Sequence, residues 1–174
     1  MTPADVAALF DHLYFVRDRV LAASDDPGAP FVDPAPPTLR DLRSTLVHEL
    51  DVEWSWRVRL ASDDRTRFNE DDEELDPADF DSIEAIRARW QADEAEMRAW
   101  LASLTEADLN GPCRTEAGDG RHPFWFHLQH LYSHGLQQLA DAATLLTAAG
   151  RSPGELDFLE YAERVRDAGH ARSA

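Results

Sequence analysis

One predicted helix, between His122 and Gly150, constrains the fold more than any other stretch because it has two distinct faces. Pro123 near its start and Gly150 just past its end are typical helix boundaries. At about 100° per residue, one arc is apolar, and it holds Trp125, Leu128, Tyr132, Leu136 and Leu139. A second arc, about 80° wide, is polar, and it holds His127, His130, His134 and Gln137. A helix with this pattern is expected at the centre of a helical bundle.

Three further segments repeat their apolar residues at helical spacing. Thr2-Pro3 starts the first, which runs to about residue 23. Thr38, with Asp41 three residues later, predicts the start of the second, which runs to about residue 60. Residues 81–84 have a capping pattern for the third, which ends near residue 104 and is followed by one more turn at residues 105–109.

The connections between these segments are polar or rich in proline. Residues 24–37 contain five prolines and predict a long loop. Residues 62–79 are acidic around Glu70 to Glu74 and predict a solvated loop, without the glycine turn of a calcium site. Residues 110–121 have room for at most a small hairpin. Residues 152–155 predict the cap of a short last helix.

Together these segments predict an all-α fold, a four-helix bundle with a short extra C-terminal helix. No alternating strand pattern and no internal repeat is present. A single domain is expected over residues 1–168, with a frayed tail over residues 169–174.

The charge of the chain argues against negatively charged partners. The chain has 34 acidic and 17 basic residues and a net charge of -17, which disfavours nucleic acids and anionic membranes. All basic residues are arginine, which we interpret as the codon bias of a GC-rich genome. A single cysteine, Cys113, and the absence of an apolar run of about 20 residues favour a soluble, cytoplasmic protein.

The histidines indicate metal chemistry. His130 and His134 stand four residues apart on one helix face, a spacing at which two imidazoles can hold one ion from the same side. His48 lies on a polar arc of the second predicted helix, which is either a solvated face or a cavity wall. Three other histidines are expected to be ordinary hydrogen-bonded or surface residues, namely His12, His122 and His170. The glutamate of a zinc-protease HExxH motif is absent, as are a nucleophile elbow, a P-loop and a dinucleotide fingerprint.

Three stretches, residues 46–54, 127–137 and 150–158, resemble the DinB-like family of metal-dependent four-helix bundles. The resemblance covers essentially the whole chain and implies three metal ligands, which map to His48, His130 and His134. It implies that the polar arc of His48 faces the metal cavity. Residues expected in the pocket wall or around the ligands are His127, Gln137, Asp51, Ser55 and Arg59. The chain departs from the family pattern at Gly135, where many members have a basic residue. This difference affects a local hydrogen bond and does not affect the three implied metal ligands.

Three imidazoles suit Zn(II), Ni(II) or Fe(II) and leave open positions for water or substrate. Members with an assigned activity resemble thiol S-transferases and thiol-dependent isomerases. The resemblance thus implies a small-molecule substrate and a low-molecular-weight thiol, with mycothiol favoured by the GC-rich composition. A homodimer is a further possibility for such a bundle.

Two alternatives stay open at this point. One is a metal-dependent hydrolase, in which His127 or an acidic residue serves as the base. The other is a non-catalytic metal- or ligand-binding stress protein with a closed coordination sphere. Cys113 is expected to be inert, and the five tryptophans are expected in the core or the pocket wall.

Overall fold

The computed structural model describes residues 1–25, 28–29, 31–61, 75–113 and 120–173, with residues 168–173 as backbone alone. Its helices are α1 (Pro3–Ser24), α2 (Leu42–Ala61), the 3-10 turn η1 (Pro77–Asp79), α3 (Ile83–Ser103), α4 (Glu106–Asn110), α5 (Trp125–Ala148) and α6 (Phe158–Ser173). Within these ranges the only β-type pairing is an isolated bridge between Pro112 and Pro123. The acidic run of residues 70–74 and the side chain of His170 lie outside the described residues.

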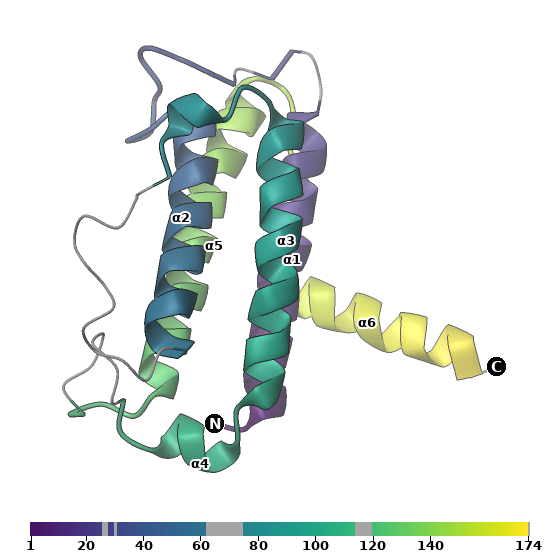
Figure 1. Cartoon of the computed structure of the whole chain (residues 1–174). Helices are drawn as coiled ribbons and strands as arrows, with labels where there is room; N and C mark the ends of the chain where they lie inside the picture. Colours follow the sequence, from purple (N-terminus) through teal and green to yellow (C-terminus); the bar gives the residue numbers. More distant parts are fainter. Residues whose placement is uncertain (26–27, 30, 62–74, 114–119, 174) are drawn as a thin grey trace.

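The four long helices form a bundle in which each packs against two others (Figure 1). Helix α1 packs against α3 and α5, and α2 packs against the same two helices from the other side. The short α4 lies at the end of the bundle that holds the N-terminus, and α6 projects away from α1 (Figure 1). The structure confirms the predicted all-α four-helix bundle with an extra C-terminal helix.

The predicted starts of three helices are confirmed by their caps. The Thr2 hydroxyl accepts a hydrogen bond from the Asp5 amide at 3.2 Å, and the Asp5 carboxylate accepts one from the Thr2 amide at 2.8 Å. Ser82 accepts from the Ala85 amide at the start of α3. Thr105 and Asp108 form the same reciprocal pair at α4.

The predicted start of the second helix is wrong by one turn. Asp41, not Thr38, caps α2, because its carboxylate accepts a hydrogen bond from the Ser44 amide at 2.8 Å. The Thr38 hydroxyl instead donates to the Arg40 carbonyl oxygen. Leu39, which the helical spacing counted as apolar face, is 83% exposed.

The predicted start of the last helix is also wrong. Residues 151–157 are not helical, and Gly154 has a φ of 79°, which a continuing right-handed helix does not allow. Asp157 caps α6 by accepting from the amides of Leu159 and Glu160. The stretch before it is tied to the bundle, because His12 is bonded through Nε2 to the Leu156 carbonyl oxygen at 3.1 Å. Its other ring nitrogen, Nδ1, lies 3.0 Å from the Tyr132 hydroxyl, and these two partners account for the burial of His12.

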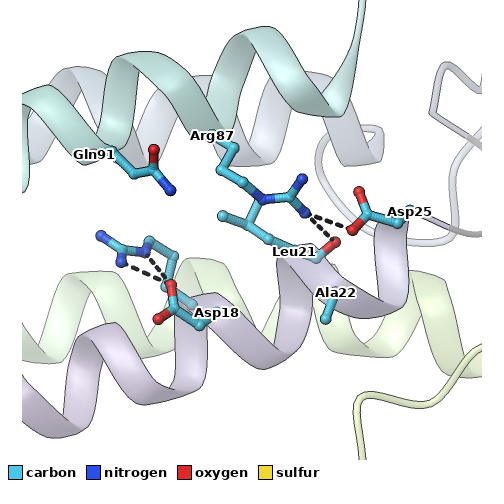
Figure 2. Close-up of a pocket in the computed structure, with 7 residues that line it drawn as sticks. Asp18, Leu21, Ala22, Asp25, Arg87 and Gln91 are labelled. Atoms are coloured by element: carbon cyan, nitrogen blue, oxygen red, sulfur yellow. Dashed lines mark hydrogen bonds and ion pairs between the residues drawn. The ribbon is translucent and has the colours of Figure 1, made fainter.

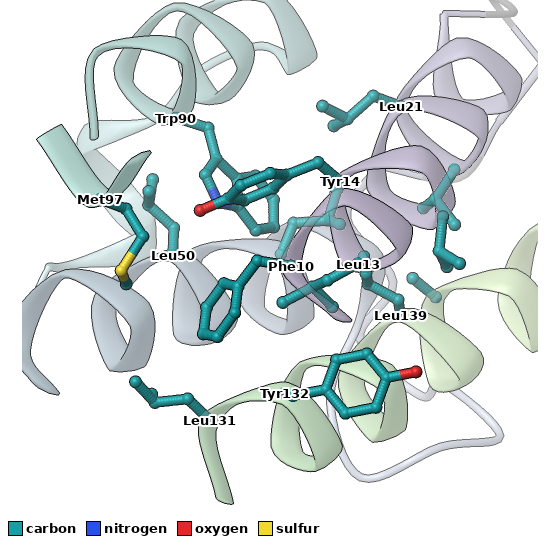
Figure 3. Packing of buried hydrophobic residues seen from close by; sticks show 14 of the residues in the cluster. Phe10, Leu13, Tyr14, Leu21, Leu50, Trp90, Met97, Leu131, Tyr132 and Leu139 are labelled. Carbon is teal, nitrogen blue, oxygen red and sulfur yellow. The ribbon is translucent and has the colours of Figure 1, made fainter. Parts of the chain in front are cut away.

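The core fills the space between the four long helices. Trp90 from α3, Phe10 from α1, Leu50 from α2 and Leu131 from α5 are at most 2% exposed and lie in one cluster (Figure 3). Burying side chains of this size stabilises the fold by about 1.5–3 kcal/mol each. The apolar arc of α5 faces this cluster, and its opposite arc therefore remains for the histidines.

None of the described helices combines the length and the apolar character that crossing a bilayer requires. The frayed tail expected from residue 169 and the domain limit at residue 168 stay predictions. Helical backbone continues to Ser173, while the side chains of these residues lie outside the description.

Candidate metal centre

Helices α2 and α5 bring two predicted metal ligands together. The rings of His48 and His134 have centroids 5.3 Å apart and are nearly perpendicular, at 66°. His130, one turn earlier on α5, has its ring centroid 6.1 Å from that of His134. The three predicted ligands therefore share one region of the α2/α5 face.

The three histidines differ in burial. His48 and His134 are half-buried between the helices, whereas His130 is exposed. Among the described residues, no three His, Cys, Asp or Glu side chains are placed to hold a metal ion as they stand. The structure thus shows a close pair, with the third imidazole adjacent, and the metal triad stays a prediction.

Glu49 is the polar partner of His134. Its Oε2 lies 2.7 Å from His134 Nδ1, and the Glu49 residue is 1% exposed. Space for this carboxylate comes from Gly135, where an added Cβ would lie 2.5 Å from Glu49 Oε1 and 2.8 Å from Leu13 Cδ1. The glycine therefore allows α1 and α2 to approach α5 closely beside His134.

The surroundings of this pair oppose charge on either group. Burial, followed by the nearby His48, His130 and Arg40, lowers the pKa of His134 to about 4. Burial, followed by the neighbouring Glu53, raises the pKa of Glu49 well above its ordinary value. We therefore interpret the contact as a hydrogen bond rather than an ion pair, and His134 is neutral near pH 7, the state in which imidazole binds metals.

The lowered pKa of His134 predicts a low midpoint for this residue when the metal-free protein is titrated with acid and followed by NMR. Its imidazole should stay neutral until the pH falls to about 4. An unfolded chain binds this proton near pH 6.5, so His134 should disfavour the folded state increasingly as the pH falls from 6.5 to 4. The raised pKa of Glu49 acts in the opposite sense, because it penalises folding as the pH rises above 4.5. A His134 midpoint at or above its ordinary value would contradict this environment.

One turn after Glu49 on α2, Glu53 connects the site to the core. It is 2% exposed and accepts hydrogen bonds from the Tyr14 hydroxyl at 2.5 Å and from Trp90 Nε1 at 2.9 Å. Burial raises the pKa of Glu53, while these two donors lower it. The network anchors α2 to α1 and α3, and thereby holds the helix from which His48 and Glu49 project.

Trp56 forms the other side of the histidine face. The His127 ring is stacked on it, with centroids 6.0 Å apart at 28°, and the His130 ring lies 5.2 Å away. The Arg59 guanidinium carbon lies 5.7 Å from the Trp56 ring centroid. Burial, followed by His122 and His130, lowers the pKa of His127. His127 and Arg59 are thus grouped around Trp56 rather than around the His48 and His134 pair.

The remaining predicted pocket residues lie at different places. Asp51 accepts a hydrogen bond from the Leu75 amide at 3.0 Å, which ties the segment before η1 to α2. The Ser55 hydroxyl donates to the Val52 carbonyl oxygen. Gln137 is exposed on α5, about one turn past His134. Cys113 is buried.

Two of the cavities in the described part of the chain illustrate that hollows lie away from this face. One, of about 310 Å³, lies between α1 and α3, where Arg87 donates to the Leu21 carbonyl oxygen and to Asp25 (Figure 2). The other, of about 610 Å³, has Trp100 and Phe124 in its lining near α4. Neither cavity is lined by a histidine. The histidine face is therefore a separate feature of the molecule.

Sequence reasoning missed Glu49 as a partner of His134. A signal was present, because Glu49 and Glu53 are four residues apart on the side of α2 that also carries buried leucines. Carboxylates are almost never fully buried unless they have partners, so such a pair predicts internal hydrogen bonds.

Comparison with curated proteins finds no match for this chain. A family model described as the DinB superfamily matches residues 2–142. The matched range includes α1, α2, α3 and most of α5, and hence both helices of the histidine face. The chain therefore belongs to the DinB superfamily.

Proposed function

We propose that this chain is a metal-dependent enzyme in which His48, His130 and His134 hold one divalent ion. The observation that carries the proposal is the 5.3 Å separation of the His48 and His134 rings. An ion about 2.0–2.1 Å from each nitrogen places two ligand ring centroids roughly 5 Å apart. His130 is exposed and adjacent, and the proposal requires its side chain to change rotamer so that it completes the set.

The residues present fit such an ion chemically. His134 is neutral near pH 7, and its Nδ1 is bonded to Glu49, so Nε2 is the nitrogen left for a second partner. A carboxylate on the far nitrogen is the usual support for a metal-binding histidine. Zn(II), Ni(II) and Fe(II) all accept imidazole ligands, and three ligands leave positions open for a substrate.

The proposed reaction is transfer of a low-molecular-weight thiol to a small electrophile, as a transferase or an isomerase. A bound divalent ion lowers the pKa of a thiol and so makes its thiolate available at neutral pH. On the protein side, His127 is neutral because its pKa is lowered, and it is suited to accept the thiol proton. In a transferase the carbon–sulfur bond then forms as the leaving group departs from the electrophile. In an isomerase the thiolate adds to the substrate and is expelled again, so the thiol is regenerated.

Other parts of the face have supporting roles in this proposal. The Trp56 ring, with His127 and His130 against it, supplies an aromatic wall for a small substrate. Arg59 over the same ring supplies a positive charge at the edge of the wall. Mycothiol is the favoured thiol because the chain contains arginine without lysine, as expected for a GC-rich genome.

A turnover assay tests the reaction. Protein loaded with zinc, nickel or iron is expected to consume a generic electrophile only when a thiol such as mycothiol or glutathione is added. The His127→Gln variant should bind the metal as the wild type does but react several-fold more slowly, with the largest loss near neutral pH. The His122→Gln variant is the matched control, because His122 stacks on Phe126 rather than on Trp56.

Turnover without any thiol would contradict the transferase proposal and favour a hydrolase. Intact metal binding with no turnover for any thiol would favour a non-catalytic site.

A further inference from the structure

We propose that Glu49 is a positioning residue for His134, and that position 135 is glycine because Glu49 occupies the space of its side chain. The carboxylate is buried and lies 2.7 Å from His134 Nδ1. An imidazole offers Nε2 to a cation only when its other proton is on Nδ1, and that N–H then needs an acceptor. Glu49 is placed to be this acceptor, because a carboxyl group keeps an accepting oxygen whether it is ionised or protonated.

The glycine supports the assignment independently. Glycine in the interior of a helix costs about 1 kcal/mol relative to alanine, so a buried glycine in the middle of α5 needs a reason. At position 135, a Cβ would meet Glu49 Oε1 at 2.5 Å and Leu13 at 2.8 Å. An alanine there would push Glu49 away from His134 or separate α5 from α1. Gly135 therefore makes room for the Glu49 carboxyl group, and this packing explains why a residue that destabilises helix interiors stands here.

Glu49 is next to His48, the other proposed ligand, in the sequence of α2. His48 and Glu49 are consecutive on α2, and both contact the His134 ring, one through its face or edge and one through Nδ1. One helix segment thus fixes both the distance between the two imidazoles and the rotation of the His134 ring. The part of the proposal that concerns metal affinity rests on the proposed function, whereas the orientation of His134 does not.

Two substitutions of Glu49 separate positioning from packing. The Glu49→Gln variant keeps a carbonyl oxygen that can accept from Nδ1–H, whereas Glu49→Leu keeps the bulk and removes the acceptor. Removing the acceptor leaves the His134 Nδ1–H without a partner but also takes a carboxyl group out of the core. The leucine variant should therefore stay folded without urea, with a urea midpoint at or below that of the wild type, and should bind zinc about 10–100-fold more weakly. The glutamine variant should retain most of the affinity.

The metal-free protein supplies a second readout. Nitrogen-15 NMR of the His134 ring should show a hydrogen-bonded Nδ1 in the wild type and in Glu49→Gln, and loss of that signature in Glu49→Leu. Gly135→Ala should also change the His134 signals and weaken zinc binding. Ser133→Ala is the control on the same helix, because the Ser133 hydroxyl donates to the backbone of its own helix.

The outcomes distinguish the two proposals. Unchanged His134 signals in Glu49→Leu would overturn the positioning role, as would zinc affinity equal to that of the wild type. If the wild type binds no zinc while the His134 signals still depend on Glu49, the proposed function fails and the orientation role stands. A leucine variant that binds zinc weakly only because it is unfolded in urea-free buffer would be overturning evidence as well, since a purely structural role predicts it.

Discussion

Replacing Trp90 with alanine should lower the free energy of unfolding by about 3–5 kcal/mol. Trp90 is 1% exposed and lies in the same core cluster as Tyr14 (Figure 3), and both side chains donate to the Glu53 carboxylate. Its removal leaves a cavity between the helices and also takes one of the two hydrogen-bond donors from the buried carboxylate of Glu53. Urea denaturation followed by circular dichroism measures the loss.

Two control variants separate the packing of Trp90 from its hydrogen bond. Trp90→Phe keeps most of the ring but removes the N–H, and should cost less than Trp90→Ala. Trp54→Ala removes a half-buried indole from α2 that contacts Arg89, and should cost clearly less than Trp90→Ala. Equal losses for Trp54→Ala and Trp90→Ala would contradict the position assigned to Trp90.

Replacing His48 or His134 with alanine should reduce the affinity for a divalent metal by about 100-fold or more, because each variant removes one of the two imidazoles that already lie together. His130→Ala should have a similar effect if its exposed ring completes the set. Calorimetric titration with zinc measures these affinities. The variants should remain folded, since none of the three side chains belongs to the fully buried core.

His127→Ala is the informative control for these titrations. His127 is stacked on Trp56 and is not part of the proposed ligand set, so its loss should leave zinc affinity within a few-fold of the wild type. A large loss for His127→Ala, together with normal binding by His48→Ala, would move the site from the α2/α5 contact to the Trp56 side of the face.

The four long helices could be predicted from the sequence because their apolar residues recur at helical spacing and their ends carry recognisable caps. Thr38 with Asp41 three residues later fits a capping box, but that local pattern does not show where the backbone first becomes helical, and in the structure Asp41 itself is the cap. The start of α6 depends on contacts with distant parts of the chain. His12 and Arg19 on α1 bond to carbonyl oxygens of the preceding segment and hold it out of a helix.

The candidate site shows the same division. Spacing alone placed His130 and His134 on one face, but bringing His48 beside them requires the packing of α2 on α5, for which the family resemblance supplied the expectation. The partnership of Glu49 with His134 depends on the depth of that packing and on the missing side chain at Gly135. The spacing of residues along the sequence gives neither the closeness of α2 to α5 nor the space left at Gly135. The contact between Glu49 and His134 could therefore be found only from the three-dimensional structure.

A cobalt(II) titration of the metal-free protein, purified without an affinity tag, measures directly whether the three histidines bind one ion. Visible absorption is expected that saturates at one cobalt ion per chain and disappears when zinc displaces the ion. The same titration of His134→Ala should show no such absorption. Absence of saturable binding in the wild type, or an unchanged spectrum in His48→Ala, His130→Ala and His134→Ala alike, would contradict a metal centre at this face.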